Sequence, residues 1–207
     1  IQVMKLKDLE YELSSVLPFE NPKIDLEQVA TSPHLASRML FTAATHFDDI
    51  KDCSVGDFGC GAGILSIGCQ LLGSSVNVGF DIDADALDSA WVNCKRLEID
   101  TIDFVLTDIQ LINLAYSFDT VVMNPPFGTR KAGIDTLFVK KAMDHANVVY
   151  SLHKTTTRDH FVRMSTNENY HMEVLAEMKY DLPKIHKHHK QKSKDIFVDL
   201  YRFTHKS

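Results

Sequence analysis

The sequence of 207 residues has few of the features that mark secreted, zinc-stabilised or membrane-spanning proteins. It holds only four cysteines, Cys53, Cys60, Cys69 and Cys94, and no pair has the C-x-x-C spacing of a zinc site. We therefore expect no metal site and no disulfide framework, which favours a reduced intracellular compartment. No apolar run reaches the roughly 18 residues that a membrane helix needs, so no membrane partner is expected.

An overall excess of basic residues, common in nucleic-acid-binding proteins, is also missing. The chain has 22 Lys and Arg against 28 Asp and Glu, a net charge of −6. The charge is unevenly distributed, because residues 182–207 hold seven basic and two acidic residues and carry +5, whereas the remainder carries −11. The negative charge of the remainder argues against a nucleic-acid partner, whereas the positive charge of residues 182–207 is compatible with one.

Hydrophobic periodicity predicts an α/β fold in a single domain. Apolar residues at helical spacing indicate a helix over 4–17, and Ser32 before Pro33 is a typical start of a second helix. Short β-prone runs then alternate with helical stretches near 63–72, 84–98, 135–147 and 157–168. The β-prone runs are Ser54–Phe58, Val76–Asp81, Ile102–Thr107, Phe118–Met123, Val148–His153, Met172–Leu182 and Asp195–Thr204. We predict a mostly parallel seven-stranded sheet with helices on both faces, and an antiparallel C-terminal hairpin because no helix separates the last two runs.

Five of the nine glycines lie between residues 56 and 68, within the first predicted strand and directly after it. In the segment Asp57–Gly63 they allow a tight turn and a close approach of the backbone to a ligand at the start of a helix. Asp81 ends the next predicted strand, where an acid can accept hydrogen bonds from both ribose hydroxyls. The pattern favours a nucleoside cofactor over a purely structural turn.

The spacing of these glycines discriminates between cofactors. A dinucleotide site usually has G-x-G-x-x-G, whereas Gly59, Gly61 and Gly63 form G-x-G-x-G after Asp57. This form resembles the S-adenosylmethionine loop of Rossmann-like methyltransferases, and the resemblance implies that Asp57 faces the methionine end of the cofactor. It also implies that Asp108 binds the adenine amino group; the alternative for this Asp is a turn or a helix cap.

The fourth predicted strand runs into Asn124-Pro125-Pro126-Phe127, at the end of the sheet where active sites of this fold class lie. An exocyclic amine on adenine is a poor nucleophile because its lone pair is delocalised into the ring. The side-chain carbonyl of Asn124 and the backbone carbonyl of Pro125 could each accept one of its hydrogens and orient the lone pair. Phe127 offers a flat face for stacking a flipped-out base. The alternative is a rigid turn after a core strand.

These motifs resemble class I methyltransferases acting on planar amines, and nearly the whole chain resembles the methyltransferase-like protein five family. The matching residues are Glu27-Gln28, Thr31, Pro33-His34, Asp57–Gly63, Phe80–Asp83, Asp85-Ala86-Leu87, Asn124–Thr129, Tyr150–Lys154, Tyr180–Pro183 and Ser193–Phe203. The family methylates N6 of an adenosine in small-subunit (18S) ribosomal RNA, with S-adenosylmethionine as methyl donor and S-adenosylhomocysteine as product, and without a metal.

The resemblance also assigns residues. It implies a helical lid over residues 1–50, a Rossmann-like core over 51–207, and a catalytic tetrapeptide from Asn124 to Phe127. The cofactor contacts that we expect are Gln28, Thr31, Asp57, Gly59, Gly61, Ala62, Ile64, Asp81, Asp108 and Ile109. Two positions depart from the family. Val29-Ala30 replaces a frequent Tyr-Pro, which puts the packing of the lid in doubt, and Ala62 replaces a cysteine.

The predicted strand at 102–107 lacks proline and lysine, the residues that protect a sheet edge, and this fold normally leaves that strand at the edge. Such an edge favours pairing with another chain. The resemblance implies the partner: a small zinc-binding methyltransferase-activating subunit, similar to the tRNA-methyltransferase-112 protein, which makes the chain the catalytic subunit of a heterodimer. It also implies a location in the nucleus, the nucleolus and the cytoplasm.

One basic block between the last two predicted strands is a candidate surface for the ribosomal RNA. Residues 184–194 hold five lysines and three histidines without an acid. We expect phosphate contacts from Lys184, Lys187, His188, Lys190, Lys192 and Lys194. The alternative is a solvated hairpin loop. No second cluster of Cys or His completes a metal site with these histidines.

Three other functions compete with RNA methylation. A protein glutamine N5-methyltransferase uses a similar motif on a planar amide, but a dedicated peptide-binding N-terminal domain is missing here. A catalytically silent scaffold that binds S-adenosylmethionine would have no need of both Asn124 and Phe127. An NAD-dependent oxidoreductase is disfavoured by the glycine spacing.

Overall fold

Seven strands form one sheet in the computed structural model, which describes residues 4–180 and 196–206. The strands are β1 (Ser54–Phe58), β2 (Val76–Asp81), β3 (Ile102–Leu106), β4 (Phe118–Met123), β5 (Ala146–Lys154), β6 (Tyr170–Tyr180) and β7 (Ile196–His205). Their order is β3-β2-β1-β4-β5-β7-β6. The first five strands are parallel to one another, and β7 lies antiparallel between β5 and β6. The predicted mostly parallel sheet with an antiparallel C-terminal hairpin is confirmed.

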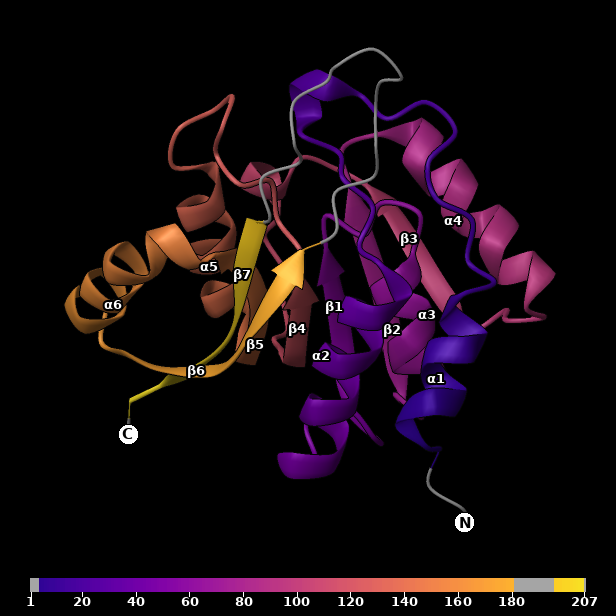
Figure 1. The fold of residues 1–207 in the computed structure, drawn as a ribbon, viewed down its shortest axis with the longest axis horizontal. Coiled ribbons are helices and arrows are strands. Elements are labelled where there is room, and N and C mark those ends of the chain that lie inside the picture. The colour runs from indigo at the N-terminus through magenta and orange to yellow at the C-terminus, as the bar shows by residue number, and fades with distance from the viewer. Residues whose placement is uncertain (1–3, 181–195, 207) are drawn as a thin grey trace.

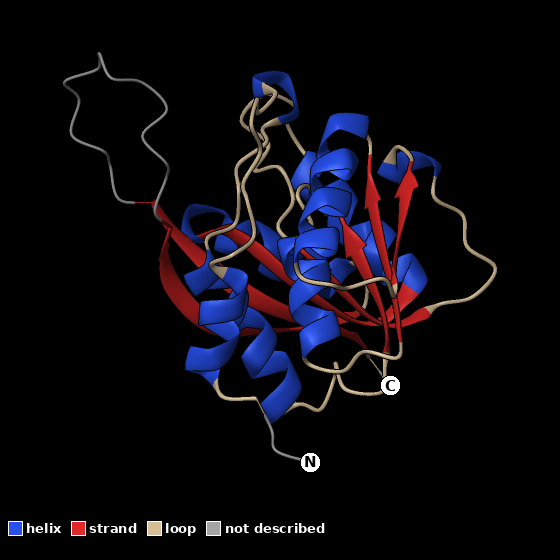
Figure 2. Ribbon diagram, turned by 90° about the vertical axis from the view of Figure 1, so that its right-hand side faces the viewer, coloured by secondary structure: helices blue, strands red, loops and turns tan. Residues whose placement is uncertain are grey.

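Helices cover both faces of this sheet, as predicted (Figure 2). They are α1 (Leu6–Leu13), α2 (Pro33–His46), α3 (Ile64–Leu71), α4 (Ala84–Arg96), α5 (Ile134–His145) and α6 (Arg158–Asn167), with the short 3-10 helices η1 (Ile24–Leu26), η2 (Ile109–Leu111) and η3 (Thr155–Thr157). Each of α1 to α4 contributes buried side chains to one core cluster, and α5 and α6 contribute to another. Within the described ranges, no helix is long and apolar enough to span a membrane.

Most predicted boundaries agree with the structure within two residues, and α1 is the main exception. The predicted helix continued to residue 17, because apolar side chains keep their helical spacing as far as Val16. In the structure α1 ends at Leu13, and a turn follows in which the Val16 amide donates to the Leu13 carbonyl at 3.1 Å. Val16 still packs on the core from that turn, so the apolar pattern outlasts the helix.

The segment that joins α1 to α2 lies over the carboxyl ends of the parallel strands (Figure 1). The two helices themselves pack on the face of the sheet, with Leu9, Leu13, Leu35 and Met39 in its core. Residues 17–32 are therefore the part of the N-terminal region that covers the functional end of the sheet, and we call them the lid segment.

Candidate active site

A cleft opens at the carboxyl ends of β1, β2 and β4, beneath the lid segment. Its walls come from the lid, the loops that follow the first four strands, α5 and the end of β6. The lining residues are Phe19, Asp25, Leu26, Glu27, Gln28, Val29, Gly59, Gly61, Phe80, Asp81, Ile82, Thr107, Asp108, Ile109, Gln110, Asn124, Pro125, Pro126, Phe127, Lys131, Ile134, Phe138 and Tyr180. The structure thus brings the glycine loop, the predicted ribose-binding acid and the complete Asn-Pro-Pro-Phe tetrapeptide together around one space.

The glycine loop forms the floor of this cleft. Gly59, Gly61 and Gly63 all have positive φ angles, of 75°, 55° and 85°, which glycine adopts without strain. The Gly59 amide donates to the Phe80 carbonyl at 2.8 Å, so the loop is fixed to the end of β2. A Cβ atom on Gly61 would lie 2.7 Å from the ring of Phe19. Glycine is therefore required at residue 61 by both its backbone angle and the lid above it.

Asp81 connects this loop to the end of β2. Its carboxylate accepts hydrogen bonds from the Gly61 amide at 2.8 Å and from the Asp83 amide at 2.9 Å. Burial raises the pKa of Asp81, and the hydrogen bonds from Asp83 and Gly61 oppose that shift. Each oxygen has used one lone pair on the backbone, which leaves acceptor capacity for ligand hydroxyls on the cleft side. The arrangement suits the ribose-binding role that we predicted for Asp81.

Four of the predicted cofactor contacts do not line the cleft: Thr31, Asp57, Ala62 and Ile64. Asp57 is fully buried, and its Oδ2 atom accepts from the Ser66 amide at 2.9 Å and the Ser66 hydroxyl at 2.6 Å. Desolvation raises the pKa of Asp57 to about 7, although the Ser66 bonds oppose the shift. In the structure Asp57 therefore holds the first turn of α3 against β1. Its predicted contact with the methionine end stays a prediction.

Gln28, Asp108 and Ile109 line the cleft. Asp108 caps η2 by accepting from the Gln110 amide at 2.9 Å, so the capping interpretation applies while its side chain remains beside the cleft. The amide group of Gln28 is occupied within the protein, because it donates to Asp83 at 2.7 Å and accepts from the Lys23 amide at 2.7 Å. Gln28 thus shapes the lid wall through these bonds.

Asn124 is held with one end of its amide engaged and the other free. Its Nδ2 atom donates to the Thr31 hydroxyl at 2.9 Å and to the Tyr180 hydroxyl at 3.2 Å. Its Oδ1 atom is buried and accepts no hydrogen bond from any residue that the structure describes. A buried carbonyl oxygen without a donor costs free energy, about 1–3 kcal/mol, unless a ligand supplies the donor. The side chain is therefore prepared to accept a hydrogen from an amine in the cleft.

Aromatic and basic side chains surround the last residue of the tetrapeptide. The ring of Phe127 meets that of Tyr180 edge to face at 5.6 Å between centroids. The Lys154 ammonium lies 5.5 Å from the centre of the Phe127 ring. Phe127 is half-buried and lines the cleft beside Pro125 and Pro126. It can therefore offer apolar ring surface to a planar ligand.

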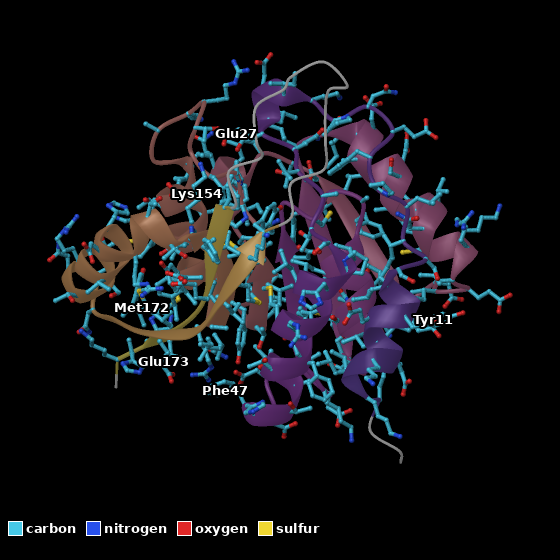
Figure 3. The ribbon with its side chains drawn as sticks, viewed as in Figure 1. Tyr11, Glu27, Phe47, Lys154, Met172 and Glu173 are labelled. Atoms are coloured by element: carbon cyan, nitrogen blue, oxygen red, sulfur yellow. The ribbon has the colours of Figure 1, made fainter. Side chains whose placement is uncertain are left out.

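The lid segment is fastened on both sides of the cleft. Glu27 accepts from the Thr129 amide at 3.0 Å, the Thr129 hydroxyl at 2.7 Å and the Arg130 amide at 2.7 Å, in the loop after β4. Burial alone would raise the pKa of Glu27, but these bonds lower it below its ordinary value. Lys23 forms ion pairs with Asp83 and Asp85 at the start of α4. Figure 3 shows Glu27 and Lys154 toward the same end of the molecule, and Glu27 lines the cleft.

Sequence reasoning gave no site role to several lining residues, among them Phe19, Lys131 and Tyr180. Phe19 lies in a polar stretch without periodicity, and Tyr180 was noted only as a family match. Lys131 lies in the loop after β4, and no motif marked it. The predicted RNA contacts Lys184, Lys187, His188, Lys190, Lys192 and Lys194 lie outside the described residues. Within residues 4–180 and 196–206, no group of three or more His, Cys, Asp or Glu is placed to hold a metal ion.

Comparisons with known proteins give similarities over nearly the full chain. The family model of the methyltransferase small domain matches residues 30–182. The rRNA N(6)-adenosine-methyltransferase METTL5 of Danio rerio is 52% identical over 97% of this chain and 99% of its own. The Drosophila melanogaster protein of the same name is 46% identical over 97% of this chain and 96% of its own. The crystal structure of PH1948 from Pyrococcus horikoshii superposes with a TM-score of 0.86 at 31% identity, covering 99% of this chain and 98% of that one.

Proposed function

Because the chain belongs to the methyltransferase-like protein five family, within the methyltransferases of the small-domain type, we propose that it methylates N6 of an adenosine in small-subunit (18S) ribosomal RNA. The observation that carries the proposal is the buried, unpaired Oδ1 atom of Asn124, a residue that lines the cleft. A planar amine is the ligand that supplies the missing hydrogen while exposing a nucleophilic nitrogen. The choice of ribosomal RNA as the substrate that bears this amine is supported by the similar rRNA N(6)-adenosine-methyltransferases.

The residues of the cleft would act by orientation and electrostatics. The adenine would lie against Phe127, with one hydrogen of its amino group donated to Asn124 Oδ1 and the other to the Pro125 carbonyl. Both bonds draw the nitrogen toward tetrahedral geometry and hold its lone pair in one direction, without a strong base. The two prolines keep the backbone of this loop rigid, so the acceptors do not have to reorganise during the reaction.

We propose S-adenosylmethionine as the methyl donor, with no metal in the reaction. The backbone cradle of Gly59 and Gly61 and the acceptor capacity of Asp81 fit its adenosine part, and Asp108 and Ile109 line the same cleft. When bound, the cofactor supplies the electrophilic methyl group. The lid residues Phe19 and Gln28 would enclose it and exclude water.

The distribution of a radioactive methyl group tests the substrate class. The full chain is incubated with S-adenosylmethionine labelled in the methyl group, together with small ribosomal subunits, and RNA and protein are then separated and counted. The proposal expects the label in the RNA. Label in ribosomal protein would instead support the glutamine N5-methyltransferase, and binding of the cofactor without any transfer would support the silent scaffold.

We also propose that the basic block between β6 and β7 contacts RNA phosphates. Replacing Lys187, Lys190, Lys192 and Lys194 with Glu should abolish RNA binding, since it changes the charge of the segment by eight units and repels the phosphates. Binding of S-adenosylmethionine should persist in the same variant. Filter binding and calorimetry measure the two affinities, and an unchanged RNA affinity would show that the block is a solvated loop.

The free edge of β3 is the surface that we propose for the zinc-binding activating subunit, the partner that makes this chain half of a heterodimer. β3 lies at one edge of the sheet and pairs only with β2 among the described strands. Val105 and Leu106 are 40% and 58% exposed, and Trp91, 47% exposed, packs on Phe104 beside them. An exposed apolar edge of this kind can be covered by a strand added from another chain.

Lysines on this edge should prevent the association. In co-expression with the activating subunit, the double variant Val105→Lys/Leu106→Lys should purify alone, because lysines block strand addition. Val162→Lys is the control, since Val162 is 48% exposed on α6 and lies away from β3. Co-purification of the double variant at the wild-type level, or full activity of the chain without the subunit, contradicts this assignment.

The cellular location of the protein is also a proposal. We propose that the protein is present in the nucleus, the nucleolus and the cytoplasm, the compartments in which small-subunit ribosomal RNA is made and used. Cell fractionation with an antibody against the chain tests it, and confinement to another compartment contradicts it.

A further inference from the structure

Two hydroxyl groups from distant parts of the chain meet at the amide of Asn124. Thr31, at the end of the lid segment, is 93 residues away in sequence, and Tyr180, at the end of β6, is 56 residues away. Both side chains are buried, with 9% and 2% of their surface exposed. Burial raises the pKa of Tyr180, against the opposing effect of its bond to Asn124, so the phenol keeps its proton at neutral pH.

The hydroxyl oxygens occupy both amide hydrogens of Asn124. An amide nitrogen has two hydrogens to donate, and here one is directed to Thr31 and the other to Tyr180. The carbonyl end then faces the other way, where its oxygen has no donor among the described residues. If the amide were turned by 180°, its NH₂ group would take the place of this oxygen and could not accept a hydrogen from an incoming amine. Only the observed orientation presents an acceptor.

We propose that Thr31 and Tyr180 are positioning residues for methyl transfer, which hold the Asn124 amide in the orientation that accepts a hydrogen from the target amine. The inference rests on the proposed function for the nature of that amine, and on the geometry for the rest. Tyr180 has a second contact, because its ring meets Phe127 edge to face. The hydroxyl and the ring of this residue thus touch the first and the last residue of the tetrapeptide.

Hydroxyl deletions separate this role from packing. Tyr180→Phe and Thr31→Val remove the hydroxyls and keep the shape of the side chains, and Thr31→Ser retains the hydroxyl. We expect kcat to fall about fivefold in each deletion, the size typical of one neutral hydrogen bond. In Tyr180→Phe the KM for RNA and the Kd for S-adenosylmethionine should stay within about twofold, and Thr31→Ser should recover most of the kcat lost in Thr31→Val. Tyr170→Phe is the matched control, because Tyr170 lies at the opposite end of β6.

A double-mutant cycle and a spectroscopic measurement complete the test. In an Asn124→Ala background, where there is no amide to orient, the two deletions should change the residual rate no further. In the free protein labelled with ¹⁵N-asparagine, the side-chain amide signal that is absent from Asn124→Ala should shift in Tyr180→Phe and in Thr31→Val, but not in Tyr170→Phe. The spectrum needs no substrate, so it tests the geometry even if the methylated group proves to be a different amine.

Three results would overturn the inference. The first is a wild-type kcat in both hydroxyl deletions. The second is a loss of kcat that persists undiminished in the Asn124→Ala background, because the hydroxyls would then act elsewhere. The third is an Asn124 amide signal that neither deletion moves. A wild-type chain that methylates glutamine instead of RNA would refute the proposed function alone, since the same kinetic comparison can then be made on that amide.

Discussion

Replacing Asn124 with alanine is expected to lower kcat for methyl transfer by about 100- to 1000-fold, the loss typical when one group that stabilises developing charge is removed. The variant loses the side-chain acceptor of Asn124, the Oδ1 atom, which has no donor among the described residues. The affinity for S-adenosylmethionine should change little, because the glycine loop and Asp81 are untouched. Single-turnover rates with ribosomal RNA and calorimetry with the cofactor measure the two effects.

Asn113→Ala is the control for this experiment, because Asn113 is an exposed asparagine in the loop after η2. It should have wild-type kinetics. A rate for Asn124→Ala within about threefold of the wild type would contradict an acceptor role for the amide. An equal loss of cofactor affinity would indicate instead that Asn124 supports the cleft as a whole.

The Asp81→Asn variant is expected to bind S-adenosylmethionine roughly 30-fold more weakly, which corresponds to ~2 kcal/mol. The carboxylate accepts from the amides of Gly61 and Asp83, so one oxygen orders the glycine loop and the other the start of α4. An asparagine would turn an NH₂ group toward one of these amides, and it would also lose the charge that strengthens hydrogen bonds from ribose hydroxyls. Calorimetry of cofactor binding measures the change.

The matched control for Asp81 is Asp88→Asn, since Asp88 is an exposed acid on α4. Its cofactor affinity should equal that of the wild type. If Asp81→Asn also bound the cofactor normally, the assignment of the ribose to the end of β2 would be wrong. The turnover of the Asp81 variant at saturating cofactor should stay near the wild-type value, which distinguishes a binding residue from one that acts in the reaction.

The strands and the shared cleft could be predicted because their signals are local. β1, β2 and β4 begin and end where the β-prone runs do, since each run is bounded by glycine, proline or a polar turn. The topology of parallel strands then places the ends of β1, β2 and β4 together, which brings Gly59, Asp81 and Asn124 to one cleft. The exposed edge of β3 followed from the same topology.

The interactions inside the site could not be predicted, because they join residues that are far apart in the sequence. Nothing around Tyr180 indicates that its hydroxyl meets Asn124, and nothing around Glu27 indicates that its carboxylate binds the loop after β4. Asp57 has a partner within the protein that its motif did not indicate. The structure shows it bonded to Ser66 and absent from the cleft wall, while its contact with the cofactor stays a prediction. A motif fixes where a residue lies along the chain, while packing decides which way its side chain points.

Nucleoside mass spectrometry tests the central claim most directly. Small-subunit ribosomal RNA from cells lacking the enzyme is incubated with the chain and S-adenosylmethionine carrying a trideuterated methyl group, then digested to nucleosides. The wild-type chain should produce N6-methyladenosine with the deuterium label, and the Asn124→Ala chain should produce almost none. Deuterium in a different nucleoside, or the same amount of labelled N6-methyladenosine from both chains, would contradict the account.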